Sequence, residues 1–165
     1  MIWQMHQLLL VCHIFLAITW VGGILFIGWG VYPASQALAP RTRQTFLYTL
    51  MKKTHHLFSL AGLGVILTGI VLGTFLGPLR NWHMILHTTY GHIWLTALII
   101  ASFTLLWGVC VGYRQSMRLF NNDALWQAAE RGNPRALQKA MRQTVVLESV
   151  EVLGFIVIII CMVLL

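Results

Sequence analysis

The chain has 165 residues, of which 58% are hydrophobic and only 9% are charged. A chain with so few charged residues has too little polar surface to coat a soluble globule. The composition therefore excludes a soluble domain and indicates an integral membrane protein. The balance of charge is basic, with 11 Lys and Arg against 4 Asp and Glu. Such an excess also occurs in nucleic-acid-binding proteins, and the positions of the charges along the chain distinguish the two classes.

Four apolar runs are long enough to cross a bilayer, whose hydrocarbon core of about 30 Å takes roughly 20 helical residues. They lie at residues 8–32, 57–79, 93–113 and 145–165. We therefore predict an all-α fold, a single four-transmembrane-helix domain over residues 1–165 that forms a four-helix bundle. No signal-peptide cleavage site is evident, so we expect the first run to be retained.

The basic residues are concentrated in two loops, one between the first two runs and one between the last two. Of the 11 lysines and arginines, only Arg80 lies elsewhere. Loops rich in Lys and Arg stay on the cytoplasmic side of a membrane. We therefore predict a multi-pass protein of the cell inner (plasma) membrane, with both termini outside. Contact with the lipid bilayer then explains the charge, and nucleic acid is not expected as a partner.

The first run contains His13, followed by Trp20 and then by the pair Gly22 and Gly23. Seven residues make two helical turns, so His6, His13 and Trp20 share one stripe of the helix. An ionisable side chain inside a membrane span indicates a functional site by default. His13 is therefore the first candidate ligand of the chain.

The second and third runs carry further histidines. A helix that begins at residues 41–45 brings His55 and His56 to the cytoplasmic edge of the membrane and ends at Gly77 and Pro78. His92 lies near the outer end of the third run. If the first and third helices are neighbours, His92 faces His13 at a similar depth.

The last loop and the fourth run complete the chain. We predict a short helix at residues 124–131, ended by Gly132, and a second helix that restarts at Pro134 and continues unbroken to residue 165. The early turns of this second helix are amphipathic and basic, and they either lie along the inner surface or project from it.

Glu148 and Glu151 are three residues apart on one face of the fourth run, at the predicted depth of His55 and His56. A carboxylate in lipid is costly and needs a proton or a partner. We expect these two glutamates to partner one of the two histidines or to handle protons.

A haem site is the first chemical interpretation of the histidines. Neutral imidazole ligates haem iron, and one His from each of two helices gives six coordination. We prefer His13 and His92 as the axial pair of a b-type haem, with His6 as the substitute ligand. The glycines Gly22 and Gly23 leave room beside Trp20 for the macrocycle. A second haem at His55 and His56 needs another ligand, because both histidines come from one helix.

Copper is the competing ligand. Cu(I) transport favours a ladder of thioethers and thiols. The methionines lie mostly near span boundaries and form no Met-x-x-Met repeat, and Cys12, Cys110 and Cys161 form no pair. No arrangement of Ser, His and acid indicates a catalytic nucleophile.

The run HIFLAITWVGG at residues 13–23 resembles the first helix of the CopD-like membrane proteins, named for copper resistance protein D. The related HemJ-type protoporphyrinogen oxidases share its histidine-to-tryptophan spacing. Later stretches, LTGIVLGTFLGP and TTYGHIWLTALIIA, also resemble small CopD-like proteins, so the likeness covers most of the chain.

This resemblance implies a haem-ligand role for His13, because HemJ-type proteins are associated with haem b. Those proteins also have a His-x-Lys pattern at the start of a later helix, which aligns with His92, Ile93 and Trp94. Here tryptophan stands at the position of the lysine. The resemblance therefore implies a retained haem pocket without protoporphyrinogen oxidation.

The leading hypothesis is a b-type haem-binding membrane protein for electron transfer or haem handling, acting as a homo-oligomer or within a larger respiratory complex. If it is an enzyme, we expect a membrane haem oxidoreductase. One alternative is a CopD-like copper transport or tolerance protein that uses the same histidines. The other is a cofactor-free accessory subunit of a respiratory complex.

Overall fold

The computed structural model describes residues 2–165, and no strand occurs among them. The helices are α1 (Ile2–Ala17), α2 (Gly23–Phe26), α3 (Tyr32–Ala34), α4 (Pro40–Thr74), α5 (Trp82–His87), α6 (Thr89–Trp107), α7 (Tyr113–Phe120), α8 (Asp123–Glu130) and α9 (Arg135–Leu164). The π-helical turns Ile18–Gly22 and Ile27–Val31 join α1, α2 and α3 into one rod. A third π-helical turn, Gly108–Gly112, joins α6 to α7.

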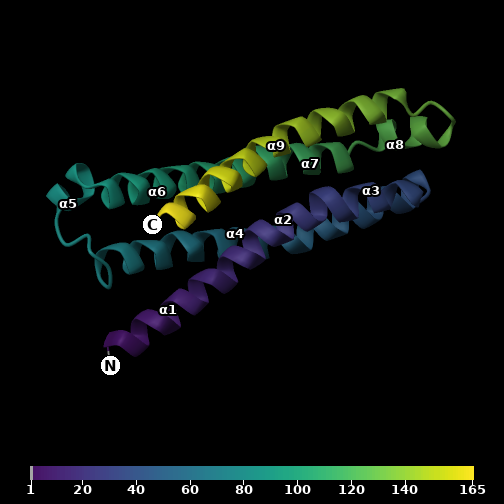
Figure 1. Cartoon of the computed structure of the whole chain (residues 1–165). Helices are drawn as coiled ribbons and strands as arrows, with labels where there is room; N and C mark the ends of the chain where they lie inside the picture. Colours follow the sequence, from purple (N-terminus) through teal and green to yellow (C-terminus); the bar gives the residue numbers. More distant parts are fainter. Residues whose placement is uncertain (1) are drawn as a thin grey trace.

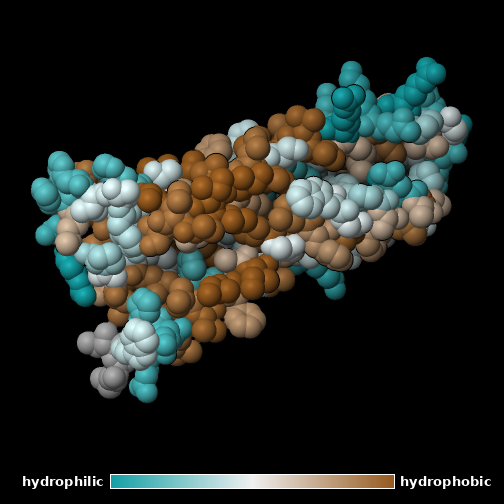
Figure 2. Space-filling view, viewed as in Figure 1, coloured by the Kyte–Doolittle hydropathy of each residue, from teal (hydrophilic) through white to brown (hydrophobic). Residues whose placement is uncertain are grey.

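Four of these helical segments are long and apolar enough to cross a membrane: Trp3–Ala37, Pro40–Thr74, Thr89–Phe120 and Arg135–Leu164. They lie side by side in one elongated bundle, with both termini toward the same end (Figure 1). Hydrophobic side chains cover the middle of the visible face, and hydrophilic ones gather at the two ends (Figure 2). The predicted all-α, four-helix membrane fold is therefore confirmed.

The second helix ends earlier than the sequence predicted, at Thr74. The chain then folds back so that the N–H of Leu79 donates to the carbonyl of Gly73 at 3.1 Å. A Cβ on Gly77 would collide with the carbonyl oxygens of Leu72 and Gly73. Glycine is therefore required by the close approach of this turn, which comes after the helix.

The helices continue beyond the hydrocarbon layer at the basic end. At 1.5 Å per residue, the 35 residues of α4 extend about 50 Å, against a core of about 30 Å. The projecting turns share their own apolar cluster around Trp126, which has 0% exposure and donates its indole N–H to the carbonyl of Leu119 at 3.0 Å. The first turns of α9 therefore continue the fourth span beyond the expected thickness of the hydrocarbon layer. They pack on α8 (Figure 1).

A polar clasp fastens α8 to α4. Gln44 donates to the carbonyl of Phe120 at 2.8 Å and to the Asp123 carboxylate at 2.9 Å, and Arg41 donates to the same carboxylate at 3.1 Å. The hydrogen bonds from Gln44 and then from Arg41 lower the pKa of Asp123. This clasp closes the basic end of the bundle.

An apolar layer crosses the middle of the bundle. It consists of Trp20, Ala61, Val65, Ala101, Phe155 and Ile158. The rings of Trp20 and Phe155 meet edge to face, with centroids 5.2 Å apart. A Cβ on Gly62 would lie 2.8 Å from the Trp20 ring, so this glycine lets the indole reach the α4 backbone.

Labelling of single cysteines tests the predicted orientation. In a variant that lacks Cys12, Cys110 and Cys161, we expect His83→Cys to react with a membrane-impermeant maleimide in intact cells. We expect Asn133→Cys, in the basic α8–α9 loop, to react only after the cells are permeabilised, because the predicted orientation places that loop in the cytoplasm. The opposite pattern of labelling would show that the protein has the reverse orientation in the membrane.

Candidate functional site

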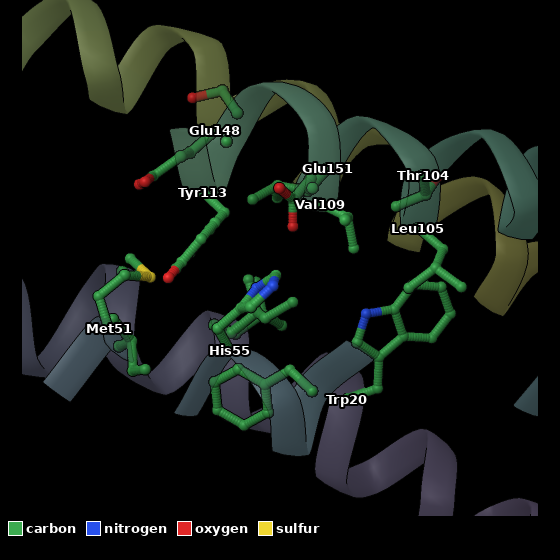
Figure 3. Close-up of a pocket in the computed structure, with 18 of the residues that line it drawn as sticks. Trp20, Met51, His55, Thr104, Leu105, Val109, Tyr113, Glu148 and Glu151 are labelled. Carbon is green, nitrogen blue, oxygen red and sulfur yellow. The ribbon is translucent and has the colours of Figure 1, made fainter. Parts of the chain in front are cut away.

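A cavity of about 150 Å³ lies between the four spans, in the half of the bundle nearer the basic loops (Figure 3). Each span contributes to its walls. The chemically distinctive lining residues are Trp20, Trp29, Tyr32, Met51, His55, Phe58, Thr104, Tyr113, Glu148 and Glu151, together with Gly28, Gly108 and Gly112.

All three π-helical turns border this cavity. The N–H of Tyr32 donates to the carbonyl of Ile27, and that of Tyr113 to the carbonyl of Gly108, each five residues earlier. The extra residue in such a turn re-aims the side chains that follow, and π-turns occur often at functional sites. Here the turns direct Trp20 and Tyr113 toward the cavity (Figure 3).

Glu151 is the most unusual residue of the cavity. Its side chain is buried, with the residue 6% exposed, against the third π-helical turn. A Cβ on Gly108 or on Gly112 would lie 2.8 Å from its Oε1 atom, so the two glycines make the space that the carboxyl group occupies. The ion pairs of residues 2–165 join Arg41 to Asp123 and Glu130, and none reaches Glu151.

Glu148 lies one helical turn closer to the basic end. Its Oε1 accepts a hydrogen bond of 2.6 Å from the hydroxyl of Ser116. The Tyr32 hydroxyl lies near Ser116 and Glu148, but it is buried without completing a hydrogen bond. The Thr104 hydroxyl is also unpaired, but it is buried against Gly154 of α9.

His55 completes the polar set. Its imidazole stacks on the Tyr113 ring, with centroids 3.7 Å apart and an interplanar angle of 14°. In Figure 3 this imidazole points from α4 toward Glu151 on α9, and the indole nitrogen of Trp20 is turned toward the same space. The structure therefore brings His55 together with the two glutamates, whereas His56 is exposed and does not line the cavity.

The other histidine pair is not brought together. His13 Nδ1 lies 2.7 Å from the Thr68 hydroxyl of α4. On α6, Trp94 faces α4 and donates its N–H to the carbonyl of Gly69 at 3.2 Å. His92 precedes Trp94 by two residues, or about 200° of helical rotation, so it faces away from α4 and from His13.

The remaining predicted site residues, His92, His6, Gly22 and Gly23, lie outside the cavity lining. His92 is exposed and its Nε2–H donates to the carbonyl of Leu86 at 2.7 Å. His6 is half-buried and lies outside the cavity lining. Gly23 makes room for the Phe58 ring, and a Cβ on Gly22 would meet only Ile18, at 4.0 Å. Gly23 therefore accommodates a side chain, and Gly22 lies at the surface of the chain.

The preferred haem ligands are not brought together within one chain. His13 bonds to Thr68 of α4 and His92 to the carbonyl of Leu86, and the cavity near the basic end contains a single histidine. The haem hypothesis therefore stays a prediction.

Metal ligation has narrow support. Among the described residues, no group of three or more His, Cys, Asp and Glu side chains is placed to hold a metal ion. Met51 and His55 lie one turn apart on α4, and both line the cavity. A thioether and an imidazole suit Cu(I), which is softer than zinc or magnesium.

Sequence reasoning missed four residues that shape the site: Gly108, Gly112, Tyr113 and Ser116. The signal was present as two glycines four residues apart, with a tyrosine at once after them and a serine one turn later. Such a stretch reads as ordinary helix packing until the facing helix is known.

No family model, no curated protein and no solved structure matches this chain. The resemblance to CopD-like and HemJ-type proteins therefore remains a prediction.

Replacing Glu151 tests whether its carboxylate lacks a structural partner. We expect Glu151→Gln to raise the free energy of unfolding by about 1 kcal/mol, because an amide is cheaper to bury than an unpaired carboxyl group. In a chain of this size that corresponds to a rise in melting temperature of about 2–4 °C, measured in detergent at neutral pH without added ligand. Glu148→Gln is the matched control and gains less, since Ser116 already serves Glu148. A clear loss of stability in Glu151→Gln would contradict this view of the site.

Proposed function

We propose that this protein binds a small cation in the inner cavity and exchanges it for protons, as a proton-linked cation carrier of the membrane. The observation that supports this proposal is Glu151, a buried carboxylate with no cationic partner among the described residues. Intramembrane carboxylates commonly mark ion pathways and proton relays.

Charge balance explains the exchange. Among residues 2–165, no lysine or arginine lines the cavity. The other ionisable side chains that line the cavity are Glu148 on the same helix, His55 on α4, and the phenols of Tyr32 and Tyr113. A cation that enters beside Glu151 replaces a proton on the carboxyl group, and a returning proton releases the cation. Each exchange of one monovalent cation for one proton leaves the net charge of the cavity unchanged.

Packing closes the cavity along the bundle in both directions. The apolar layer around Trp20 and Phe155 separates the cavity from the far half of the bundle. Toward the basic end, Glu148 accepts a hydrogen bond from the fully buried Ser116, and the apolar cluster around Trp126 lies beyond them. Transport across the membrane therefore requires the packing on each side to open in turn.

Proteoliposomes that contain a pH-sensitive dye test the proposal. The cations Na⁺, K⁺, Mg²⁺, Cu(I) and choline are added in turn to the outside, and we expect at least one of them to move protons. Glu151→Gln abolishes this exchange, because an amide neither carries a proton for exchange nor neutralises a cation. Glu130→Gln, an exposed glutamate of α8 outside the cavity, retains it. The proposal fails if no cation moves protons, or if Glu151→Gln exchanges as well as the parent protein.

Copper handling is the second candidate, and it is supported by the placement of Met51 and His55 on one face of the cavity. It predicts stoichiometric copper in the purified protein and its loss in Met51→Ala. The haem hypothesis is supported by the pattern of histidines along the chain and by the resemblance that begins at residues 13–23. It predicts a Soret band with sharp reduced α and β bands in the same sample, whereas cation exchange predicts a colourless protein.

A further inference from the structure

We propose that the exchanged cation is a small organic ammonium ion, with its charged nitrogen beside Glu151 and its apolar body toward Trp20. This inference rests on the proposed function and names the substrate class of the same site. It follows from the walls of the cavity and from the scarcity of metal ligands.

The walls are mainly aromatic and aliphatic. Five aromatic rings line the cavity, those of Trp20, Trp29, Tyr32, Phe58 and Tyr113, and Leu105 and Val109 add apolar surface. Aromatic faces attract ammonium groups by about 0.5–2 kcal/mol each, most strongly when water is excluded. An ammonium ion that carries alkyl groups therefore gains from walls that offer little to a bare inorganic ion.

The polar atoms are too few for a hard metal ion. Mg²⁺ and Ca²⁺ take six or more oxygen ligands, and no cluster of three metal-ligating side chains occurs in the described part of the chain. Stripping the hydration shell from a small ion in an apolar cavity is costly. An alkylammonium ion needs only one counter-charge, because its charge is spread and its substituents are apolar.

The site has two ends of different character. Glu151 lies against Gly108 and Gly112, whose missing side chains leave its carboxyl group at the cavity wall. Toward the middle of the membrane the cavity ends at the buried indole of Trp20 (Figure 3). A volume of about 150 Å³ selects small amines over large polycyclic cations.

Calorimetry with a charge-matched pair of ligands tests the proposal. The probes are choline and its uncharged isostere 3,3-dimethylbutan-1-ol, titrated into the detergent-purified full chain. We expect choline to bind at least tenfold more tightly than the isostere. Its binding heat changes with the ionisation enthalpy of the buffer, because a proton leaves Glu151 when the cation enters.

Single substitutions test separately how the charge of Glu151 and the aromatic rings contribute to choline binding. We expect Glu151→Gln to weaken choline binding at least tenfold and Glu130→Gln to leave it unchanged. Tyr113→Phe keeps the ring and the affinity, whereas Tyr113→Leu loses several-fold. Trp29→Leu provides a second test of the rings without disturbing a packed core, because Trp29 is 71% exposed.

Three outcomes would overturn the inference. Equal binding of choline and its isostere would make the site one for neutral ligands. Glu151-dependent proton exchange with Na⁺, K⁺, Mg²⁺ or Cu(I), but not with choline, would leave the proposed function standing and assign an inorganic substrate. If no cation exchanges for protons in any assay, the proposed function itself fails.

Discussion

A carboxyl group inside a membrane must be held by a protein donor, a proton or a cation, because hydrocarbon cannot solvate it. Glu151 meets this constraint in an unusual way. It is buried against two glycines and not against a basic residue. The bundle therefore has room for the carboxyl group but no fixed charge to neutralise it, and a mobile partner has to do so.

Much of the half of the bundle nearer the basic loops contributes to the surroundings of Glu151. The π-helical turn Gly108–Gly112 positions the glycines and presents Tyr113, which stacks on His55. Toward the middle of the bundle, the apolar layer around Trp20 excludes water from the cavity. Toward the basic end, the packing of Trp126 and the clasp at Asp123 hold the projecting helices together. Rigid packing on both sides leaves the space between the spans as the place where a ligand can exchange.

The sequence predicted the spans well, because long apolar runs and basic loops follow directly from the cost of burying polar groups in lipid. It also predicted that Glu148 and Glu151 share a face and lie at the depth of His55, since helical periodicity and distance from the loop determine both. It predicted the short helix before Gly132, whose φ of +87° suits the glycine that follows a helix.

The histidine pair shows where sequence reasoning stops. Periodicity tells which residues share a stripe, but it does not tell which helix that stripe faces. His13 contacts Thr68 of α4, and the rotation between His92 and Trp94 turns His92 away from it. The π-helical turns were also missed, because an extra residue in a helical turn leaves the hydrophobic pattern almost unchanged. The early end of α4 at Thr74 depends on a chain reversal at Gly77 that hydropathy does not reveal.

Infrared difference spectroscopy of the protein in lipid, recorded on adding choline, tests the central claim most directly. We expect choline to cause loss of the carbonyl stretch of a protonated carboxyl group and gain of carboxylate bands. Both changes are absent in Glu151→Gln and retained in Glu130→Gln. A spectrum without a carboxyl change, or with the same change in Glu151→Gln, would contradict the claim that Glu151 exchanges a proton for a cation.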